Sequence, residues 1–150
     1  MKRFRFRLQR LLEIRQQETK MALNNFAQAR IATQTAARRL EAASARRAES
    51  AERLLARRQS RMTVLEWRQS AELHEALVAA EWLAAERLAA ARQEEERRRW
   101  ELTEAERREK VLERLRDRRA AEFERAMLAA EQAAIDEMAQ TVYREGGGRR

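Results

Sequence analysis

The chain has 150 residues, of which 39% are charged and 5% aromatic, and it contains no proline and no cysteine. This composition is typical of a long helix or coiled coil, and it argues against a layered globular core, a disulfide framework or a thiolate metal site. The formal net charge of +8 makes the distribution of charge along the chain important, because a basic balance can indicate a nucleic-acid partner.

The first predicted element is a helix over residues 4–58. Its apolar residues follow helical spacing, with large side chains every fourteen residues at Leu12, Phe26, Leu40 and Leu54. A stripe this long and narrow can be buried only against another helix. Most of the other stripe residues are alanine, and Arg47 interrupts the stripe, so we expect a thin core.

A turn is predicted at residues 59–63, because Thr63 and Glu66 have the spacing of a capping box at the start of a helix. The second helix is then expected over residues 64–143, with a frayed tail at 144–150 that contains all three glycines. Its own apolar stripe is interrupted by charged residues such as Glu81.

Charge supports folding back at this turn. Residues 30–61 carry nine Arg and three Glu, whereas residues 66–96 carry three Arg and eight Glu. Opposite charges on facing flanks favour an all-α fold, a long antiparallel two-helix coiled coil with a longer second helix, forming one domain over 1–150. The alternative is one continuous helix that dimerises.

The sequence predicts no catalytic, cofactor-binding or metal-binding residues, and hence no enzyme. His74 is the only histidine, which leaves a histidine-based metal site or triad without partners, and no glycine-rich phosphate loop is present. Trp82 and Trp100 lie eighteen residues apart, which is five helical turns, so they project from one side of the second helix. They form either an exposed partner-binding face or an extension of the alanine core. Leu73 lies off the stripe, which favours a partner contact.

Both ends of the chain resemble the FliJ family of flagellar export proteins. The N-terminal run Phe4-Arg-Phe6-Arg-Leu8-Gln-Arg-Leu11-Leu12 is similar to the family's alternating phenylalanines and paired leucine. The later segments Lys110-Val-Leu112-Glu113-Arg-Leu115, Glu131-Gln132 and Asp136-Glu137 are similar to its C-terminal pattern. The resemblance extends over essentially the whole chain.

This resemblance implies a non-enzymatic stalk of the flagellar type III export apparatus, cytoplasmic and peripherally associated with the inner membrane. The implied partners are the hexameric export ATPase, the cytoplasmic domain of the membrane export gate protein, and export chaperones. Leu73 and Leu77 match gate-binding positions of the family. The ends of the chain are implied to lie in the ATPase ring, and the residues we expect to contact the ATPase are Phe4, Phe6, Leu8, Phe123 and Tyr143.

Two other interpretations stay open on the sequence. One is the equivalent stalk protein of a virulence type III secretion system. The other is an arginine-rich coiled coil that binds nucleic acid through its phosphates. We expect no specific nucleic acid as partner, because most of the arginine pairs are interleaved with glutamate. We also expect no small-molecule substrate, because the sequence contains no catalytic constellation.

Overall fold

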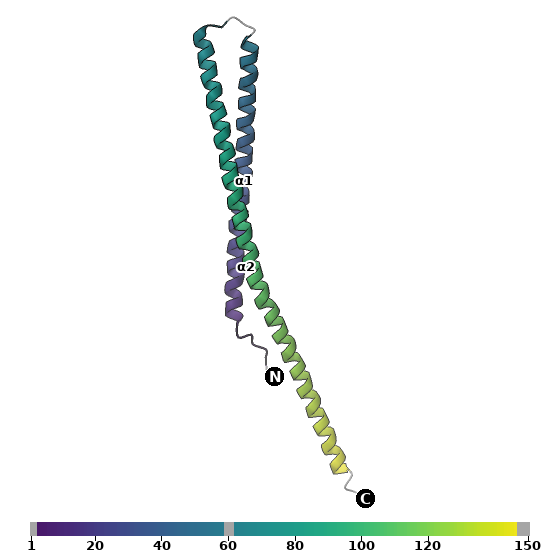
Figure 1. Ribbon diagram of the computed structural model, residues 1–150. Helices are drawn as coiled ribbons and strands as arrows, with labels where there is room; N and C mark the ends of the chain where they lie inside the picture. Colours follow the sequence, from purple (N-terminus) through teal and green to yellow (C-terminus); the bar gives the residue numbers. More distant parts are fainter. Residues whose placement is uncertain (1–2, 59–61, 147–150) are drawn as a thin grey trace. The chain divides into compact units, whose positions relative to one another are not determined.

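The computed structural model describes residues 3–58 and 62–146, and it contains two long helices that pack against each other (Figure 1). Helix α1 spans Gln9–Arg58, and helix α2 spans Val64–Gly146. No strand occurs within these described ranges. The all-α fold and the longer second helix are therefore confirmed.

The start of α1 differs from the prediction, since the helix begins at Gln9 and not at residue 4. Phe4 and Phe6 are half-buried, whereas Arg3 and Arg5 are exposed. Burial with a period of two is typical of extended chain, because successive side chains point to opposite sides. The alternating Arg-Phe pattern therefore marks an extended segment that precedes the helix.

Helix α2 starts with the predicted capping box. The backbone N–H of Thr63 donates to Oε2 of Glu66 over 2.9 Å, and the N–H of Glu66 donates back to Oγ1 of Thr63 over 3.3 Å. These bonds satisfy backbone donors that have no partner within the helix. Helix α2 continues to Gly146, so residues 144–146, which we expected in the frayed tail, belong to the helix. Residues 59–61 of the predicted turn and residues 147–150 of the predicted tail lie outside the described residues.

Contacts along the chain define two compact units. The terminal unit comprises Met1–Thr19 and Ala105–Arg150, and the central unit comprises Lys20–Glu104. Each unit contains parts of both helices, and each is described by itself below. The single domain over 1–150 stays a prediction.

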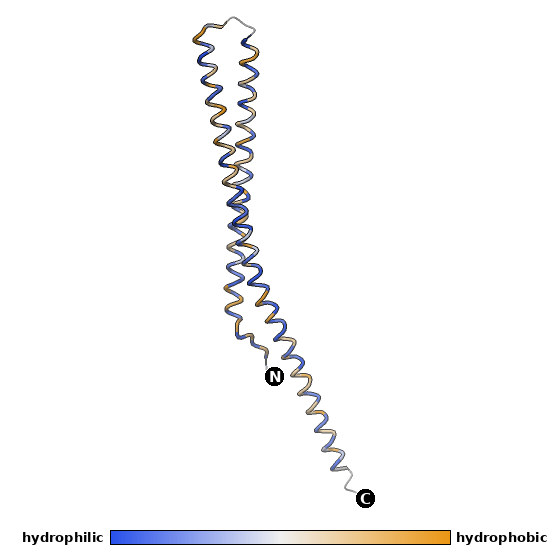
Figure 2. The backbone as a smooth tube through the Cα atoms, in the orientation of Figure 1, coloured by the Kyte–Doolittle hydropathy of each residue, from blue (hydrophilic) through white to orange (hydrophobic). Residues whose placement is uncertain are grey.

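In the central unit the two helices run antiparallel. A residue nearer the C-terminal end of α1 contacts a residue nearer the N-terminal end of α2. Oγ1 of Thr33 donates to the carbonyl oxygen of Ala91 over 3.2 Å, and Nη1 of Arg57 donates to Oγ of Ser70 over 3.2 Å. Ala29 and Leu88 are its buried apolar residues among those described. Figure 2 shows polar and apolar residues alternating along both helices. Because so few of the described apolar residues are buried, the core of this unit is thin, as predicted.

In the terminal unit the extended segment lies against α2. The rings of Phe4 and Phe123 have centroids 5.8 Å apart and planes inclined at 50°. Leu12 of α1 is fully buried. Every residue of α2 from 128 to 144 is exposed, so this part of the helix has no intramolecular cover.

Candidate partner-binding surfaces

The described residues offer no site for metal chemistry, since no group of three or more His, Asp or Glu side chains comes together within 3–58 and 62–146. His74 is half-buried, and its Nδ1 lies 3.3 Å from Oγ of Ser50 on the facing helix. Ser50 is itself buried. In the structure the histidine thus joins the two helices of the central unit.

The terminal unit contains a groove of about 950 Å³ between the extended segment and α2. We call it the terminal groove; it is lined by Arg3, Phe4, Arg5, Phe6, Arg7, Leu8, Leu115, Arg119, Glu122 and Phe123. Four of the residues expected to contact the ATPase, namely Phe4, Phe6, Leu8 and Phe123, are therefore brought together. Tyr143 lies outside this group, on the exposed part of α2, with 85% of its surface accessible.

The lining of the terminal groove combines apolar and basic side chains. Arg3, Arg5 and Arg7 extend from the segment that carries the phenylalanines, and Arg119 forms an ion pair with Glu122 over 2.9 Å. A cavity that combines aromatic rings with guanidinium groups is suited to a protein partner, because these side chains dominate binding energy at interfaces.

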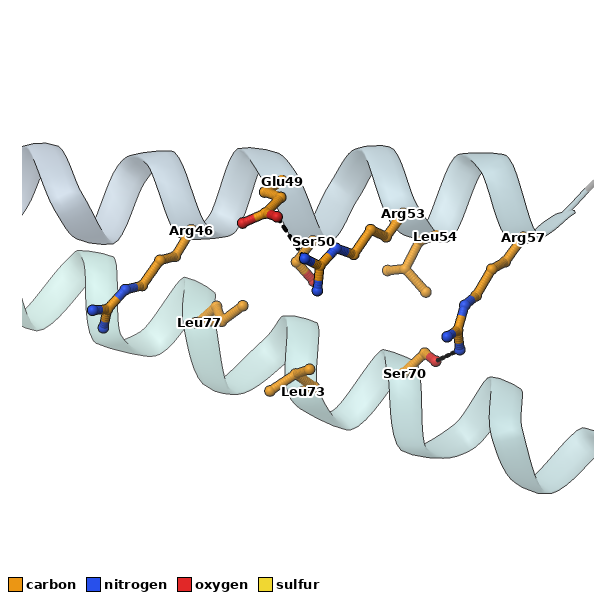
Figure 3. A pocket seen from close by; sticks show the side chains of 9 residues that line it. All are labelled: Arg46, Glu49, Ser50, Arg53, Leu54, Arg57, Ser70, Leu73 and Leu77. Carbon is orange, nitrogen blue, oxygen red and sulfur yellow. Dashed lines mark hydrogen bonds and ion pairs between the residues drawn. The ribbon is translucent and has the colours of Figure 1, made fainter.

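A second groove lies in the central unit, near the end of α1 and the start of α2 (Figure 3). We call it the turn-side groove; its volume is about 240 Å³ and its lining is Arg46, Glu49, Ser50, Arg53, Leu54, Arg57, Ser70, Leu73 and Leu77. Both predicted gate-binding residues, Leu73 and Leu77, thus line one cavity. Leu73 is 57% exposed, whereas Leu77 is half-buried.

Sequence reasoning missed Arg46 and Arg53, which together with Arg57 form the arginine edge of the turn-side groove. Arg46, Arg53 and Arg57 follow one face of α1 and line the same groove as the leucines of α2 (Figure 3). Their spacing of seven and four residues is the signal that could have identified them. Arg53 forms an ion pair with Glu49, and Arg57 donates to Ser70.

The predicted tryptophan face is exposed in the structure. Trp82 and Trp100 each have 65% of their surface accessible, and both belong to α2 in the central unit. They therefore do not widen the alanine core. A partner for this face stays a prediction.

The charged residues before Trp100 form ion pairs within α2. Glu94 binds Arg97 and Arg98 over 2.8 Å each, and Arg98 also binds Glu101 over 2.9 Å. Desolvation raises the pKa of Glu94, but the hydrogen bonds and positive charges of Arg97 and Arg98 outweigh it, so the pKa is lowered overall. The hydrogen bonds to Glu101 and then to Glu94 raise the pKa of Arg98. These arginines act as helix-stabilising partners of carboxylates.

A comparison with known protein families shows the family of this chain. The family model of the flagellar FliJ protein matches residues 4–148, which is nearly the whole chain. The chain belongs to the FliJ family. Membership makes it a stalk component of flagellar protein export, and the matching family is flagellar, as the resemblance at both ends of the sequence implied.

No curated protein matches the chain, and no solved structure matches it. Within the described residues, neither helix of this FliJ-family chain has a stretch both apolar and long enough to span a membrane.

Proposed function

We propose that this chain is a non-enzymatic adaptor that binds the hexameric export ATPase, promotes assembly and activity of its ring, and links it to the export gate and to export chaperones. The observation that carries the proposal is the terminal groove, which gathers aromatic, leucine and arginine side chains beside an uncovered stretch of α2. Family membership supplies the export context.

The terminal unit is the proposed ATPase-binding part. Phe4 and Phe6 are only half-buried against α2, so apolar surface is left for a partner. The exposed part of α2 adds Tyr143 and further large apolar residues, namely Leu128, Ile135, Met138 and Val142. An amphipathic helix with no intramolecular cover gains stability when a partner buries it.

The turn-side groove is the proposed gate-binding part, through Leu73 and Leu77. This role would place the protein in the cytoplasm, at the inner membrane, by contact with the gate. Trp82 and Trp100 are a third proposed partner-binding face, since large exposed aromatic side chains are typical interface anchors.

The test of the ATPase role replaces Phe4, Phe6 and Leu8 together by alanine. ATP hydrolysis by the purified export ATPase and assembly of its ring are measured with and without the variant. We expect the wild-type chain to raise both, and the triple variant to lose the effect while its helicity stays unchanged, because these residues precede α1.

The matched control is Leu23→Ala, Leu55→Ala and Leu83→Ala together, which removes three exposed leucine side chains from the central unit. It should stimulate the ATPase as the wild type does. Equal stimulation by the control and by the Phe4, Phe6 and Leu8 variant would contradict the proposed contact.

A further inference from the structure

The turn-side groove combines exposed apolar surface with positive charge. Leu73 is 57% exposed, although it lies over a cavity that Leu54 and Leu77 also line. Figure 3 shows the leucines of α2 and the arginines of α1 bordering the same space. The lining of the groove therefore combines leucines with arginines, around the buried Ser50.

The arginine edge is long enough to contact several residues of a partner. Arg46 and Arg57 are eleven residues apart in one helix, which is about 16 Å at a rise of roughly 1.5 Å per residue. That length corresponds to about five residues of extended chain or three turns of helix. The occupant that fits is a short peptide segment.

The charge of the lining favours a segment of opposite charge. Three arginines and one glutamate line the groove, so positive charges exceed negative ones. Glu49 and Arg53 form an ion pair, so their charges compensate each other, and the lining keeps a formal net charge of +2. A partner that places carboxylates along this edge would complement it, whereas a basic partner would be repelled.

We propose that the turn-side groove binds an acidic segment with an apolar anchor, supplied by the cytoplasmic domain of the export gate protein. Carboxylates of the segment pair with Arg46, Arg53 and Arg57, and its apolar side chain packs on Leu73 and Leu77. The inference rests on the proposed gate role. It adds that the bound segment is acidic, and it names three arginines that contact the segment.

The experiment uses the full chain and the purified cytoplasmic domain of the gate protein from the same organism. The dissociation constant is measured at several NaCl concentrations for the wild type, for Leu73→Ala, and for Arg46→Glu, Arg53→Glu and Arg57→Glu combined. We expect the arginine variant to bind about tenfold or more weakly at low salt, because each attractive pair becomes repulsive. Its affinity should also lose the salt dependence of the wild type.

The matched control carries Arg30→Glu, Arg38→Glu and Arg92→Glu, three exposed arginines of the central unit that do not line this groove. It changes the net charge by the same amount and should bind nearly as the wild type does. A second version with glutamine at positions 46, 53 and 57 avoids repulsion within the fold, and it should still lose about threefold or more in affinity. Circular dichroism checks that all variants stay helical.

The outcomes separate the inference from the proposed gate role. No binding by the wild-type chain would overturn both. In another outcome, Leu73→Ala weakens binding, but the groove arginine variant binds as well as the control arginine variant does. That result would overturn the inference and leave the gate role standing. Vesicles of phosphatidylglycerol and phosphatidylcholine provide a further arm. Stronger binding to these vesicles than to the gate domain, lost in the groove variant alone, would assign the groove to anionic lipid and overturn the inference.

Discussion

The guanidinium of Arg47 on α1 forms an ion pair with the carboxylate of Glu81 on α2, within the central unit. Each residue interrupts the apolar stripe of its own helix. In the structure the two interruptions meet, and both side chains are partly shielded from solvent. The pair therefore fixes which turns of the two helices face each other, because a shift of either helix would leave a partly buried charge without its partner.

Arg47→Glu should destabilise the central unit, because it places two carboxylates where an ion pair was. We expect a loss of about 1 kcal/mol or more in the free energy of unfolding, measured by chemical denaturation followed by circular dichroism. Combining it with Glu81→Arg restores opposite charges and should recover most of the loss. Additive losses in the double variant would show that the two side chains do not interact.

Thr63→Ala should weaken the start of α2, because it removes the side-chain oxygen that accepts the Glu66 N–H. Loss of an N-cap of this kind costs about 0.5–2 kcal/mol. Thr63→Ser keeps the hydroxyl and should retain most of the stability. Equal unfolding free energies for the alanine and serine variants would argue against a stabilising cap.

Acid should remove the contribution of the Glu66 charge. The hydrogen bond from the Thr63 backbone is the main cause that lowers the pKa of Glu66, followed by the Thr63 hydroxyl, while slight desolvation opposes them and Arg57 adds attraction. A carboxyl with a lowered pKa in the fold stabilises it above the ordinary value of 4.5, and this contribution is lost as the pH falls through the folded pKa.

Unfolding of the wild type and of Glu66→Gln, compared from pH 7 downward, measures this effect. Glutamine can accept the same hydrogen bond without charge, so the advantage of the wild type should be constant near neutrality and disappear in acid. An advantage that persists at low pH would mean that the charge is not its source.

The two helices, their antiparallel pairing and the start of α2 could be predicted from sequence, whereas residues 59–61 of the predicted turn lie outside the described residues. Fourteen-residue spacing of large apolar side chains, the Thr63–Glu66 pair and the opposite charge of the two halves each follow from elementary geometry. The start of α1 was missed although Phe4 and Phe6 are two residues apart, a spacing that is typical of extended chain and does not put both side chains on one face of a helix. Phe4, Leu8 and Leu12 do have helical spacing, so the alternation of Arg and Phe is the signal that was overlooked.

The turn-side groove shows the limit of sequence reasoning more clearly. Leu73 could be placed off the stripe from its position alone. Which arginines face it depends on the register between two helices, which the sequence of either helix does not define. For the same reason the Arg47–Glu81 pair looked like two separate weaknesses of the core.

Leu12→Ala should be a costly substitution in the terminal unit, because Leu12 is fully buried. Truncation of a buried leucine typically costs about 2–5 kcal/mol, through lost burial and the cavity that remains. Leu128→Ala, with a side chain 66% exposed in the same unit, is the control and should change stability by about 0.5 kcal/mol or less. Thermal unfolding of the full chain, monitored at 222 nm, gives the loss of stability in each variant. Similar losses of stability in the two variants would show that burial of Leu12 does not stabilise the fold.

Trp82→Ala and Trp100→Ala should separate binding from stability. Both side chains are 65% exposed, so each substitution should leave the free energy of unfolding within about 0.5 kcal/mol of the wild type.

A single interface tryptophan can contribute about 2 kcal/mol or more to binding, so each variant should bind export chaperones at least about tenfold more weakly if this face is their contact. Isothermal titration with a purified chaperone measures the change, and Val78→Ala, on the same helix and 44% exposed, serves as control. Unchanged chaperone affinity in both tryptophan variants would remove this face from the proposed contacts, whereas a large loss of stability would show that the tryptophans pack against the fold.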